Sequence, residues 1–336
     1  MPWTPLHARL HRTLRQGQLL ERQQRLLVAV SGGQDSLCLI KLLLDLQPKW
    51  GWQLAIAHCD HRWRPDSQAN ADYVASLAQM WQLPFYCQVL KLADSESLER
   101  EAQAREWRYQ ALTAIAQENN YSCLVTGHTK SDLAETLLYN LFRGSGADGL
   151  QALSWRRPLT SRIQLIRPLL EVTRSETAQF CKEFSLAIWQ DITNDELKYR
   201  RNRIRQELLP YIRSHFNPQV EHALAQTAEL LRADIEYLEI AARELLQAAM
   251  PTLELSDLDS HKVGLNRVIL RQAPLALQRR VIRQFLHQIL GIAPNFAQIK
   301  KVTALITAAN RSRSDPFPGG EVAEVEGSWI WFQQPR

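Results

Sequence analysis

The chain lacks the cysteine pattern of a disulfide-rich protein or of a cysteine-ligated metal site. Its 336 residues include five cysteines, an odd number, and none forms a Cys-x-x-Cys pair. Scattered cysteines argue against a disulfide framework and against a zinc or iron–sulfur site of the cysteine type. They are typical of proteins in the reducing cytoplasm, so we expect a cytoplasmic location.

Long apolar runs are also absent. The longest runs, such as 26–30 and 37–44, are too short to span a bilayer, and the second contains Lys41. The first residues show no charged segment followed by an apolar core, so we expect no signal peptide and no membrane partner. Hydrophobic residues still make up 45% of the chain, and the length predicts two domains, each with its own core.

Acidic residues are missing from one long stretch near the C-terminus. Residues 261–314 contain ten Lys or Arg and no Asp or Glu, in a chain with a net charge of +5. Solvated surfaces usually mix the two signs of charge, and a stretch of one sign favours a polyanionic partner. A basic surface that only keeps the protein in solution is the other interpretation.

Short apolar runs alternate with helical patterns in the first half of the chain. The runs predict strands at 26–30, 54–58, 85–90 and 123–126. The patterns between and after them predict helices at 36–46, 66–82, 98–118 and 132–142. Apolar strands that alternate with helices indicate an α/β fold, a Rossmann-like parallel sheet with helices on both faces. Ligands of such sheets bind beyond the carboxyl ends of the strands, here the loops 31–36, 58–66 and 127–132.

The second half of the chain predicts a smaller, mainly helical domain. Residues 143–172 read as irregular, and residues 173–176 have capping-box spacing and start a helix. We place the domain boundary near Asn217 and Pro218, which gives a first domain of residues 1–216 and a second of residues 217–336. In the second domain we expect a long helix at 220–249, further helices in the basic stretch, and a closing hairpin or single strand at 321–332.

The string Ser31-Gly32-Gly33-Gln34-Asp35-Ser36 follows the first predicted strand and opens a helix. The glycines allow a positive φ and close approach of an anion, and the helix start adds N–H groups. Serine hydroxyls can bind phosphate oxygens, whereas an aspartate faces phosphate only across a cation, which implies Mg²⁺. The string has neither the Gly-Lys-Ser/Thr of Walker loops nor the Gly-x-Gly-x-x-Gly of dinucleotide sites. A plain Gly-Gly turn is the alternative, but the whole string favours phosphate binding.

The segment 58–67, at the end of the second predicted strand, is rich in polar side chains. His58 and His61 have no firm zinc-ligand spacing. Asp60 and the histidines can simply cap the turn. In the functional interpretation Arg64, and with it His61, faces phosphate or RNA at the edge of the sheet.

Two further pairs of charged residues lie three positions apart on predicted helices. Arg105 and Arg108 share a helix face and either pair with Glu101 and solvent or bind an adenylate or RNA phosphate. Because Asp132 and Glu135 are three positions apart, their carboxylates are expected to point the same way. They are either carboxylates that favour a first helical turn or groups that hold an ammonium nucleophile.

The quoted strings resemble a known family. Ser-Gly-Gly-x-Asp-Ser is the signature of the PP-loop ATP pyrophosphatases, which adenylate an oxygen of their substrate. The ordered set resembles bacterial tRNA(Ile)-lysidine synthetases at 31–36, 58–67, 104–109, 127–150, 191–194 and 201–205. Ser131 departs from the pattern, because many relatives show a second acid there, and the longer relatives carry further C-terminal domains.

The resemblance implies a PP-loop domain followed by a helical tRNA-contacting domain. It implies that ATP and Mg²⁺ serve to adenylate the wobble cytidine of tRNA(Ile) with the anticodon CAU, and that L-lysine then displaces AMP to form lysidine. It assigns Asp35 to magnesium and phosphates, Arg108 to the adenylate or lysine site, His128 to the neighbourhood of the base, and Asp132 with Glu135 to lysine.

The remaining assignments are to substrate binding. ATP is assigned to Ser31, Gly32, Gly33, Gln34, Asp35 and Ser36. RNA is assigned to Arg64, Arg143, Arg201, Arg205, Arg279, Arg280 and Arg283. Two rivals are tRNA base thiolation, which needs a persulfide cysteine or an iron–sulfur cluster, and a non-catalytic tRNA-binding protein on the same fold. We expect a monomer or homodimer.

Overall fold

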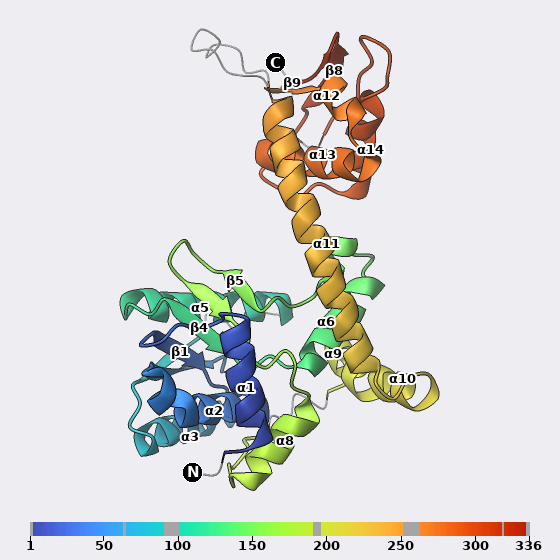
Figure 1. The fold of residues 1–336 in the computed structure, drawn as a ribbon. Coiled ribbons are helices and arrows are strands. Elements are labelled where there is room, and N and C mark those ends of the chain that lie inside the picture. Colours follow the sequence, from blue (N-terminus) through green and yellow to red (C-terminus); the bar gives the residue numbers. More distant parts are fainter. Residues whose placement is uncertain are drawn as a thin grey trace. The chain divides into compact units, whose positions relative to one another are not determined.

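A six-stranded sheet forms the centre of the N-terminal part of the chain (Figure 1). The computed structural model describes residues 3–62, 65–90, 101–190, 196–250, 263–317 and 319–333. In chain order the strands are β1 (Arg25–Ala29), β2 (Gln53–Asp60), β3 (Phe85–Val89), β4 (Cys123–Thr126), β5 (Arg156–Pro158) and β6 (Gln164–Ile166). They lie in the order β3-β2-β1-β4-β6-β5, and every neighbouring pair is parallel except β5 with β6. The predicted parallel sheet is confirmed.

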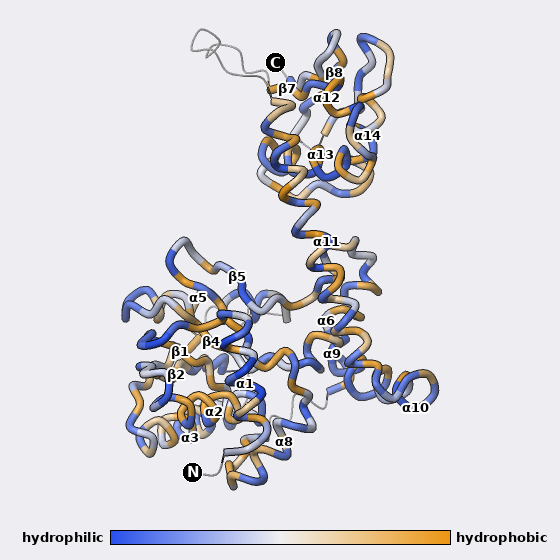
Figure 2. Tube along the Cα trace, viewed as in Figure 1, coloured by the Kyte–Doolittle hydropathy of each residue, from blue (hydrophilic) through white to orange (hydrophobic). Residues whose placement is uncertain are grey.

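Helices cover both faces of this sheet. Leu26 and Val28 of β1 pack in a core on one face, whereas Leu27 packs in a core on the other, as the two-residue period of a strand requires. Strands buried on both faces read as uninterrupted apolar runs, and β1 and β4 are coloured accordingly in Figure 2. The first face is covered by α1 (Pro5–Gln16), α2 (Gln34–Trp50), α3 (Ser67–Met80) and α8 (Arg174–Glu183), and the second by α5 (Glu101–Glu118).

The strand order reverses between β1 and β4, which places the site. From β1 the chain moves outward to β2 and β3, whereas β4 lies on the opposite side of β1 and leads into α6 (Lys130–Phe142). The loops after β1 and β4 therefore lie side by side at the carboxyl edge of the sheet. Such a switch point is where open α/β sheets bind their ligands.

The prediction that residues 143–172 are irregular is wrong. They contain α7 (Ala147–Leu150) and the strands β5 and β6, and β6 extends the parallel sheet beside β4. Each of these strands has only three residues, too few to show a period of two. Pro158 is tolerated in β5 because this strand lies at the edge of the sheet.

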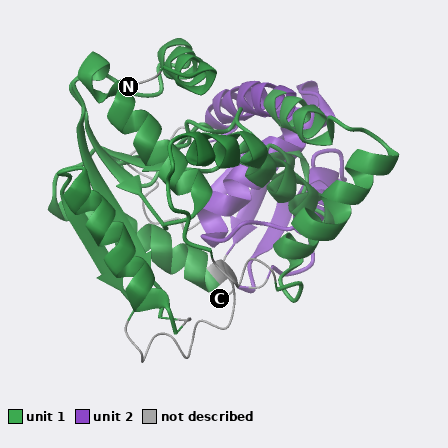
Figure 3. Ribbon diagram, turned by 90° about the horizontal axis from the view of Figure 1, so that it is seen from below, with its two compact units in different colours: residues 1–229 green, residues 230–336 purple. Residues whose placement is uncertain are grey.

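Contacts divide the chain into units of residues 1–229 and 230–336 (Figure 3). The first unit ends with α9 (Arg200–Arg203), a π-helical turn (Ile204–Leu208), α10 (Leu209–His215) and the beginning of α11 (Val220–Ala249). The helix predicted at 220–249 is confirmed, and the division falls inside it, because Leu224 and Ala228 still pack against α6 in the first unit. The predicted domain boundary at 216/217 stays a prediction.

The second unit combines a small antiparallel sheet with helices. The sheet has the order β7-β9-β8. Its elements are β7 (Val263–Asn266), α12 (Arg267–Gln272), α13 (Leu275–Leu290), α14 (Phe296–Leu305), β8 (Val322–Glu326) and β9 (Trp329–Gln333). β8 and β9 form the predicted closing hairpin, with Gly327 at φ 59° in its turn. Within the described ranges, no helix has an apolar stretch long enough to cross a bilayer.

Replacing Phe285 by alanine tests the core of the second unit. The Phe285 ring is 0% exposed and packs on Phe332 at 5.0 Å between ring centroids. Phe285→Ala is expected to lower the free energy of unfolding by about 3–5 kcal/mol, because a cavity replaces a buried ring. Urea denaturation measures this. The matched control is Phe296→Ala, since that ring is 65% exposed; equal effects of the two substitutions would contradict the packing described.

Candidate active site

A cavity of about 480 Å³ opens at the carboxyl edge of the six-stranded sheet. The loops after β1, β2 and β4 line it, with one face of α5 and the first turn of α8. The three loops chosen from the sequence therefore meet in one place. The cavity also contains Arg105, Arg108, Arg201 and Arg205.

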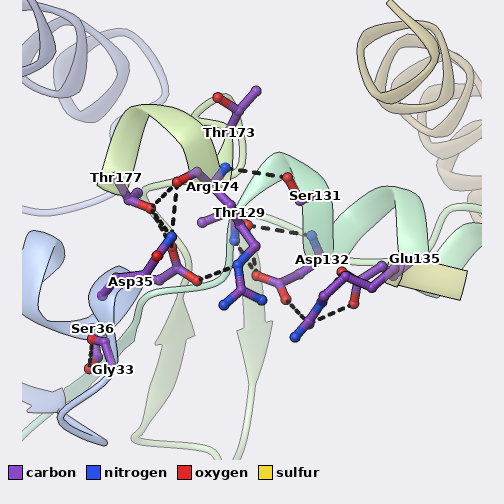
Figure 4. A network of polar contacts seen from close by, with 12 residues as sticks. Gly33, Asp35, Ser36, Thr129, Ser131, Asp132, Glu135, Thr173, Arg174 and Thr177 are labelled. Carbon is purple, nitrogen blue, oxygen red and sulfur yellow. Dashed lines mark hydrogen bonds and ion pairs between the residues drawn. The ribbon is translucent and has the colours of Figure 1, made fainter. Parts of the chain in front are cut away.

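A serine of the loop after β1 forms hydrogen bonds with the backbone of the same loop. The Ser36 hydroxyl accepts a hydrogen bond from the Ser31 amide at 3.2 Å and donates to the Gly33 carbonyl at 2.8 Å. Gly33 is the N-cap of α2. Because glycine has no side chain, it cannot accept hydrogen bonds from the first backbone amides of the helix. Figure 4 shows this turn beside Asp35. The arrangement offers backbone N–H groups and a helix N-terminus to an anion.

Two glycines are required by the close packing of this loop. Gly32 has φ 85°, and a Cβ built there would lie 2.5 Å from Asn70 Oδ1. A Cβ on Gly127, in the loop after β4, would lie 2.8 Å from the Asp35 carbonyl oxygen. The backbone after β4 thus lies against the first turn of α2, and a side chain at Gly127 would push these two loops apart, whereas one at Gly32 would meet Asn70 and Trp189. This cradle fits a polyphosphate that approaches the backbone closely.

Asp35 is held by α8, a helix far away in the sequence. Its Oδ1 accepts hydrogen bonds from the Thr177 hydroxyl at 2.5 Å and from Gln34 Nε2 at 3.3 Å, and its Oδ2 lies 3.5 Å from Arg174 Nε. Burial, with a smaller contribution from Asp132, raises the pKa of Asp35, although Arg174 opposes this. The Arg174 guanidinium lies beside this carboxylate and brings positive charge to it (Figure 4).

The donor set around Asp35 fits magnesium only when phosphate is present. In the part of the chain that the structure describes, no three His, Cys, Asp or Glu side chains gather to hold a metal ion. Mg²⁺ is usually bound by one or two carboxylates with substrate phosphates and water. Asp35 can supply one carboxylate beside the phosphate loop, so the residues present fit an ion that arrives with a nucleotide.

Asp132 belongs to the N-terminal cap of α6. Its Oδ2 accepts hydrogen bonds from the Thr129 amide and hydroxyl, both at 2.8 Å, in a capping box. Its Oδ1 lies 3.7 Å from Arg205 Nη2, beyond hydrogen-bond distance. Burial opposes ionisation of Asp132, but the hydrogen bond from the Thr129 amide and the positive charges of Arg174 and Arg205 favour the carboxylate, and the pKa of Asp132 is lowered. The carboxylate is therefore ionised, with one oxygen directed into the cavity.

Glu135 is engaged by an arginine that we assigned to RNA. Arg205 Nε and Nη2 donate to the two oxygens of Glu135 at 2.6 and 2.9 Å, which is a bidentate pair. Burial raises the pKa of Glu135, while Arg205 opposes the shift. Asp132 and Glu135 (Figure 4) thus share a direction, as their spacing predicts, and the Arg205 guanidinium lies near both.

His128 follows β4 and lies beside Asp132. Its Nδ1 is 2.9 Å from the Thr126 hydroxyl. Burial and the positive charges of Arg167, Arg105 and Arg108 lower the pKa of His128, although Asp132 opposes them. The imidazole is therefore neutral near pH 7 and offers a hydrogen-bond donor or acceptor, not a charge.

The end of β2 and the loop after it line the cavity, and several of their side chains also stabilise the turn. Arg108 donates through Nε and Nη2 to His61 Nε2 at 3.3 and 3.2 Å. His58 Nδ1 lies 2.8 Å from the Val30 carbonyl oxygen, and Asp60 accepts the Arg62 amide, so both stabilise the turn. Arg64 and the Glu101 side chain, named above as candidates, lie outside the described residues, as does the segment 191–194.

The other arginines assigned to RNA differ in their surroundings. Arg201 Nη2 donates to the Thr136 hydroxyl at 3.2 Å and lines the cavity, whereas Arg143 is exposed and its guanidinium lies over the Tyr139 ring at 5.4 Å. In the second unit, Arg280 and Arg283 both pair with Glu239 of α11. Arg279 lies over the Phe296 ring at 5.8 Å.

Sequence patterns did not reveal the residues that α8 and its neighbourhood bring to the site. Arg174 and Thr177 contact Asp35, and the Arg174 amide donates to the Ser131 hydroxyl at 3.3 Å. Trp189 donates its amide to the Gly32 carbonyl at 3.0 Å, and Asn70 donates to the Ser31 carbonyl at 3.1 Å. The capping box correctly predicted where α8 begins, but a local signal cannot show which loop the helix faces.

Comparison with known proteins gives two family matches and close relatives. Residues 4–212 match the PP-loop domain, and residues 265–327 match the TilS substrate binding domain. The chain is 64% identical to tRNA(Ile)-lysidine synthase of Nostoc sp., covering 98% of this chain and 97% of the relative. It is 51% identical to the tRNA(Ile)-lysidine synthase of Synechocystis sp., covering 99% and 98%.

A solved structure with a similar fold is the U34-tRNA thiolase NcsA from Methanococcus maripaludis with its 4Fe–4S cluster. It has a TM-score of 0.59 and 15% sequence identity, and the match covers 67% of this chain and 77% of that one. At this identity the likeness concerns the fold alone.

Gly127→Ala tests the contact between the two loops. A methyl group there meets the Asp35 backbone, and overpacking of about 1–3 kcal/mol should displace the phosphate loop. We expect ATP affinity, measured by isothermal titration calorimetry, to fall about tenfold or more. The control is Gly146→Ala, since a Cβ at that position meets nothing within 4 Å. Wild-type affinity in the Gly127 variant would show that this contact does not shape the nucleotide site.

Proposed function

Because this chain belongs to the tRNA(Ile)-lysidine synthase family, we propose that it joins L-lysine to C2 of the wobble cytidine in the CAU anticodon of tRNA(Ile). The product lysidine would change decoding from AUG to AUA. The chain is a ligase-type enzyme of the PP-loop ATP users. The observation that carries the finer proposal is that the phosphate loop and the Asp132–Glu135 pair line or border one cavity.

In the first step the C2 oxygen of cytidine attacks the α-phosphorus of ATP, and pyrophosphate leaves. The amides at the start of α2 and the hydroxyls of Ser31 and Ser36 bind the phosphates and stabilise the charge of the departing group. Mg²⁺, held by Asp35 together with phosphate oxygens, would add charge neutralisation. Neutral His128 lies at the carboxyl edge, where it can hydrogen-bond the base without repelling a cation.

In the second step the lysine ε-amine displaces AMP at C2. A free ammonium has a pKa of about 10.4 and must be oriented and lose a proton before it attacks. Asp132 is ionised and keeps one oxygen directed into the cavity, whereas Arg205 holds both oxygens of Glu135. We therefore assign the contact with the amine to Asp132, and to Glu135 the positioning of Arg205.

The rival chemistry of base thiolation is not supported by the cysteines near the cavity. All five cysteines lie within the described ranges, and Cys59 alone lines the cavity. Burial raises the pKa of Cys59 to about 12, although Arg108 opposes this, so the reactive thiolate is disfavoured. We also propose a cytoplasmic location and a monomeric or homodimeric state, which size-exclusion chromatography with light scattering would determine.

Incorporation of labelled lysine tests the proposed function. Purified protein with total tRNA, ATP-Mg²⁺ and labelled lysine is expected to transfer label into tRNA(Ile), at the wobble cytidine by mass spectrometry. Asp35→Asn should abolish this transfer and AMP release, because the carboxylate that holds the cation is removed. Asp72→Asn is the matched control, since Asp72 is exposed on α3 and accepts a hydrogen bond from Gln68 Nε2. Label that enters RNA without ATP, or not at all with the wild-type protein, would refute the proposal.

Asp132→Asn separates the two steps. The amide can still accept the Thr129 hydrogen bonds of the cap, but it binds no ammonium and accepts no proton. We expect lysine transfer to fall about 10²–10⁴-fold, whereas tRNA-dependent exchange of pyrophosphate into ATP falls far less. Both rates are measured on the same preparation. Equal loss in the two assays would remove Asp132 from the lysine step.

A further inference from the structure

A group of three arginines surrounds Tyr109 on α5. The Arg157 guanidinium lies over the Tyr109 ring at 4.8 Å, and that of Arg105 lies near the same ring at 5.7 Å. The positive charge of Arg167 acts on the same residue and contributes to lowering the pKa of the Tyr109 phenol. Among the described residues, none of these three arginines forms an ion pair with Asp or Glu.

Arg167 is the most unusual member of this group. It directly follows β6, at the same edge of the sheet as His128 after β4, and it is only 2% exposed. Its Nη1 donates to the Ser154 carbonyl at 2.7 Å, but its Nε is buried and has no hydrogen-bond partner in the described part of the chain. A buried charge without an opposite charge costs free energy, so an anion nearby would stabilise this edge of the site.

The register of β5 brings Arg157 to the same place. Arg157 pairs with Leu165 of β6, whose side chain lies in the core beneath α5. Residues opposite each other in a sheet point to the same face, so Arg157 points toward α5 and Tyr109. Although burial opposes ionisation of Tyr109, Arg167, Arg105 and Arg157 together lower the pKa of its phenol. The surroundings of the ring are therefore strongly positive.

We propose that Arg105 and Arg157, over buried Arg167, form a seat for a phosphodiester of the RNA strand next to the base that enters the cavity. This rests on the proposed function and names part of the surface that binds the RNA. Arg105 and Tyr109 line the cavity, whereas Arg157 lies exposed on the edge strand, so the positive surface continues outward from the site.

A polyanion fits this surface better than a small anion. The phosphates of ATP have their own cradle of amides at the loop after β1. The single carboxylate of free lysine would lie inside the cavity and leave the exposed guanidinium of Arg157 unused. A base splayed out of an anticodon loop has a phosphate on each side, and these must cross the rim of the pocket.

The test combines a protein variant with a modified RNA. The variant is Arg105→Gln with Arg157→Gln, and the probe is an anticodon stem-loop with the CAU anticodon. Two modified probes are made. Each carries a neutral methylphosphonate in place of one of the two phosphates that flank the cytidine. Fluorescence anisotropy gives the Kd at several salt concentrations. The matched control is Arg162→Gln, an exposed arginine in the turn of the same hairpin, near the amino end of β6.

For unmodified RNA we expect the double variant to bind about tenfold more weakly. The slope of log affinity against log salt should fall by about 0.7 for each phosphate that the variant no longer neutralises. One methylphosphonate should weaken binding to the wild type by a similar factor and to the double variant less than about twofold, because the two changes remove the same interaction. Arg162→Gln should bind like the wild type. Thermal unfolding monitored by circular dichroism checks that the double variant is folded.

Three results would overturn the seat. The first is unchanged RNA affinity of a folded double variant. The second is that, for each of the two modified probes, the losses of affinity caused by the double variant and by the methylphosphonate are fully additive. The third is a raised KM for lysine with unchanged RNA affinity, which would assign the arginines to the lysine carboxylate. Each leaves the proposed function standing if the wild type transfers labelled lysine, whereas absence of that transfer refutes the proposed function itself.

Discussion

The site depends on one contact between backbones. Gly127, after β4, lies against the carbonyl of Asp35 in the first turn of α2, where a Cβ would stand at 2.8 Å. Because no side chain separates the two loops, the phosphate loop and the cap of α6 share one cavity. The same contact fixes where Asp132 points, since this residue is tied to the Thr129 cap only two residues after Gly127. In the proposed function, this contact would bring a nucleotide on one loop close to a nucleophile on the other.

Arginines of this chain lie beside the carboxylates at the cavity. Arg174 lies beside Asp35, and Arg205 is bound to Glu135 and lies near Asp132. These contacts oppose the rise in pKa that burial causes at Asp35 and Glu135. In the proposed function, the cation beside ATP and the ammonium of lysine would each approach a carboxylate that already has a guanidinium nearby.

The sequence predicted what depends on neighbours along the chain. The four apolar runs became parallel strands, the capping box at Thr173 began α8, and the spacing of Asp132 and Glu135 gave them a common direction. It missed β5 and β6, whose three residues show no period. It also missed Arg174 and Thr177 at the site, because Thr177 lies 142 positions from Asp35 along the chain. Which helix faces which loop follows from packing of the whole sheet, and no local pattern contains that information.

The distribution of charge shows why composition and structure point to different arginines. The basic stretch 261–314 stands out by its count, yet Arg280 and Arg283 share Glu239 on α11, outside that stretch, and Arg267 and Arg271 donate to backbone carbonyls. Folding therefore uses part of this charge to hold the second unit together. The three arginines around Tyr109 come from separate places in the sequence and do not stand out in any window. Within the described ranges they pair with no carboxylate, and a charge that the fold leaves uncompensated beside a cavity is the stronger indication of an anionic partner.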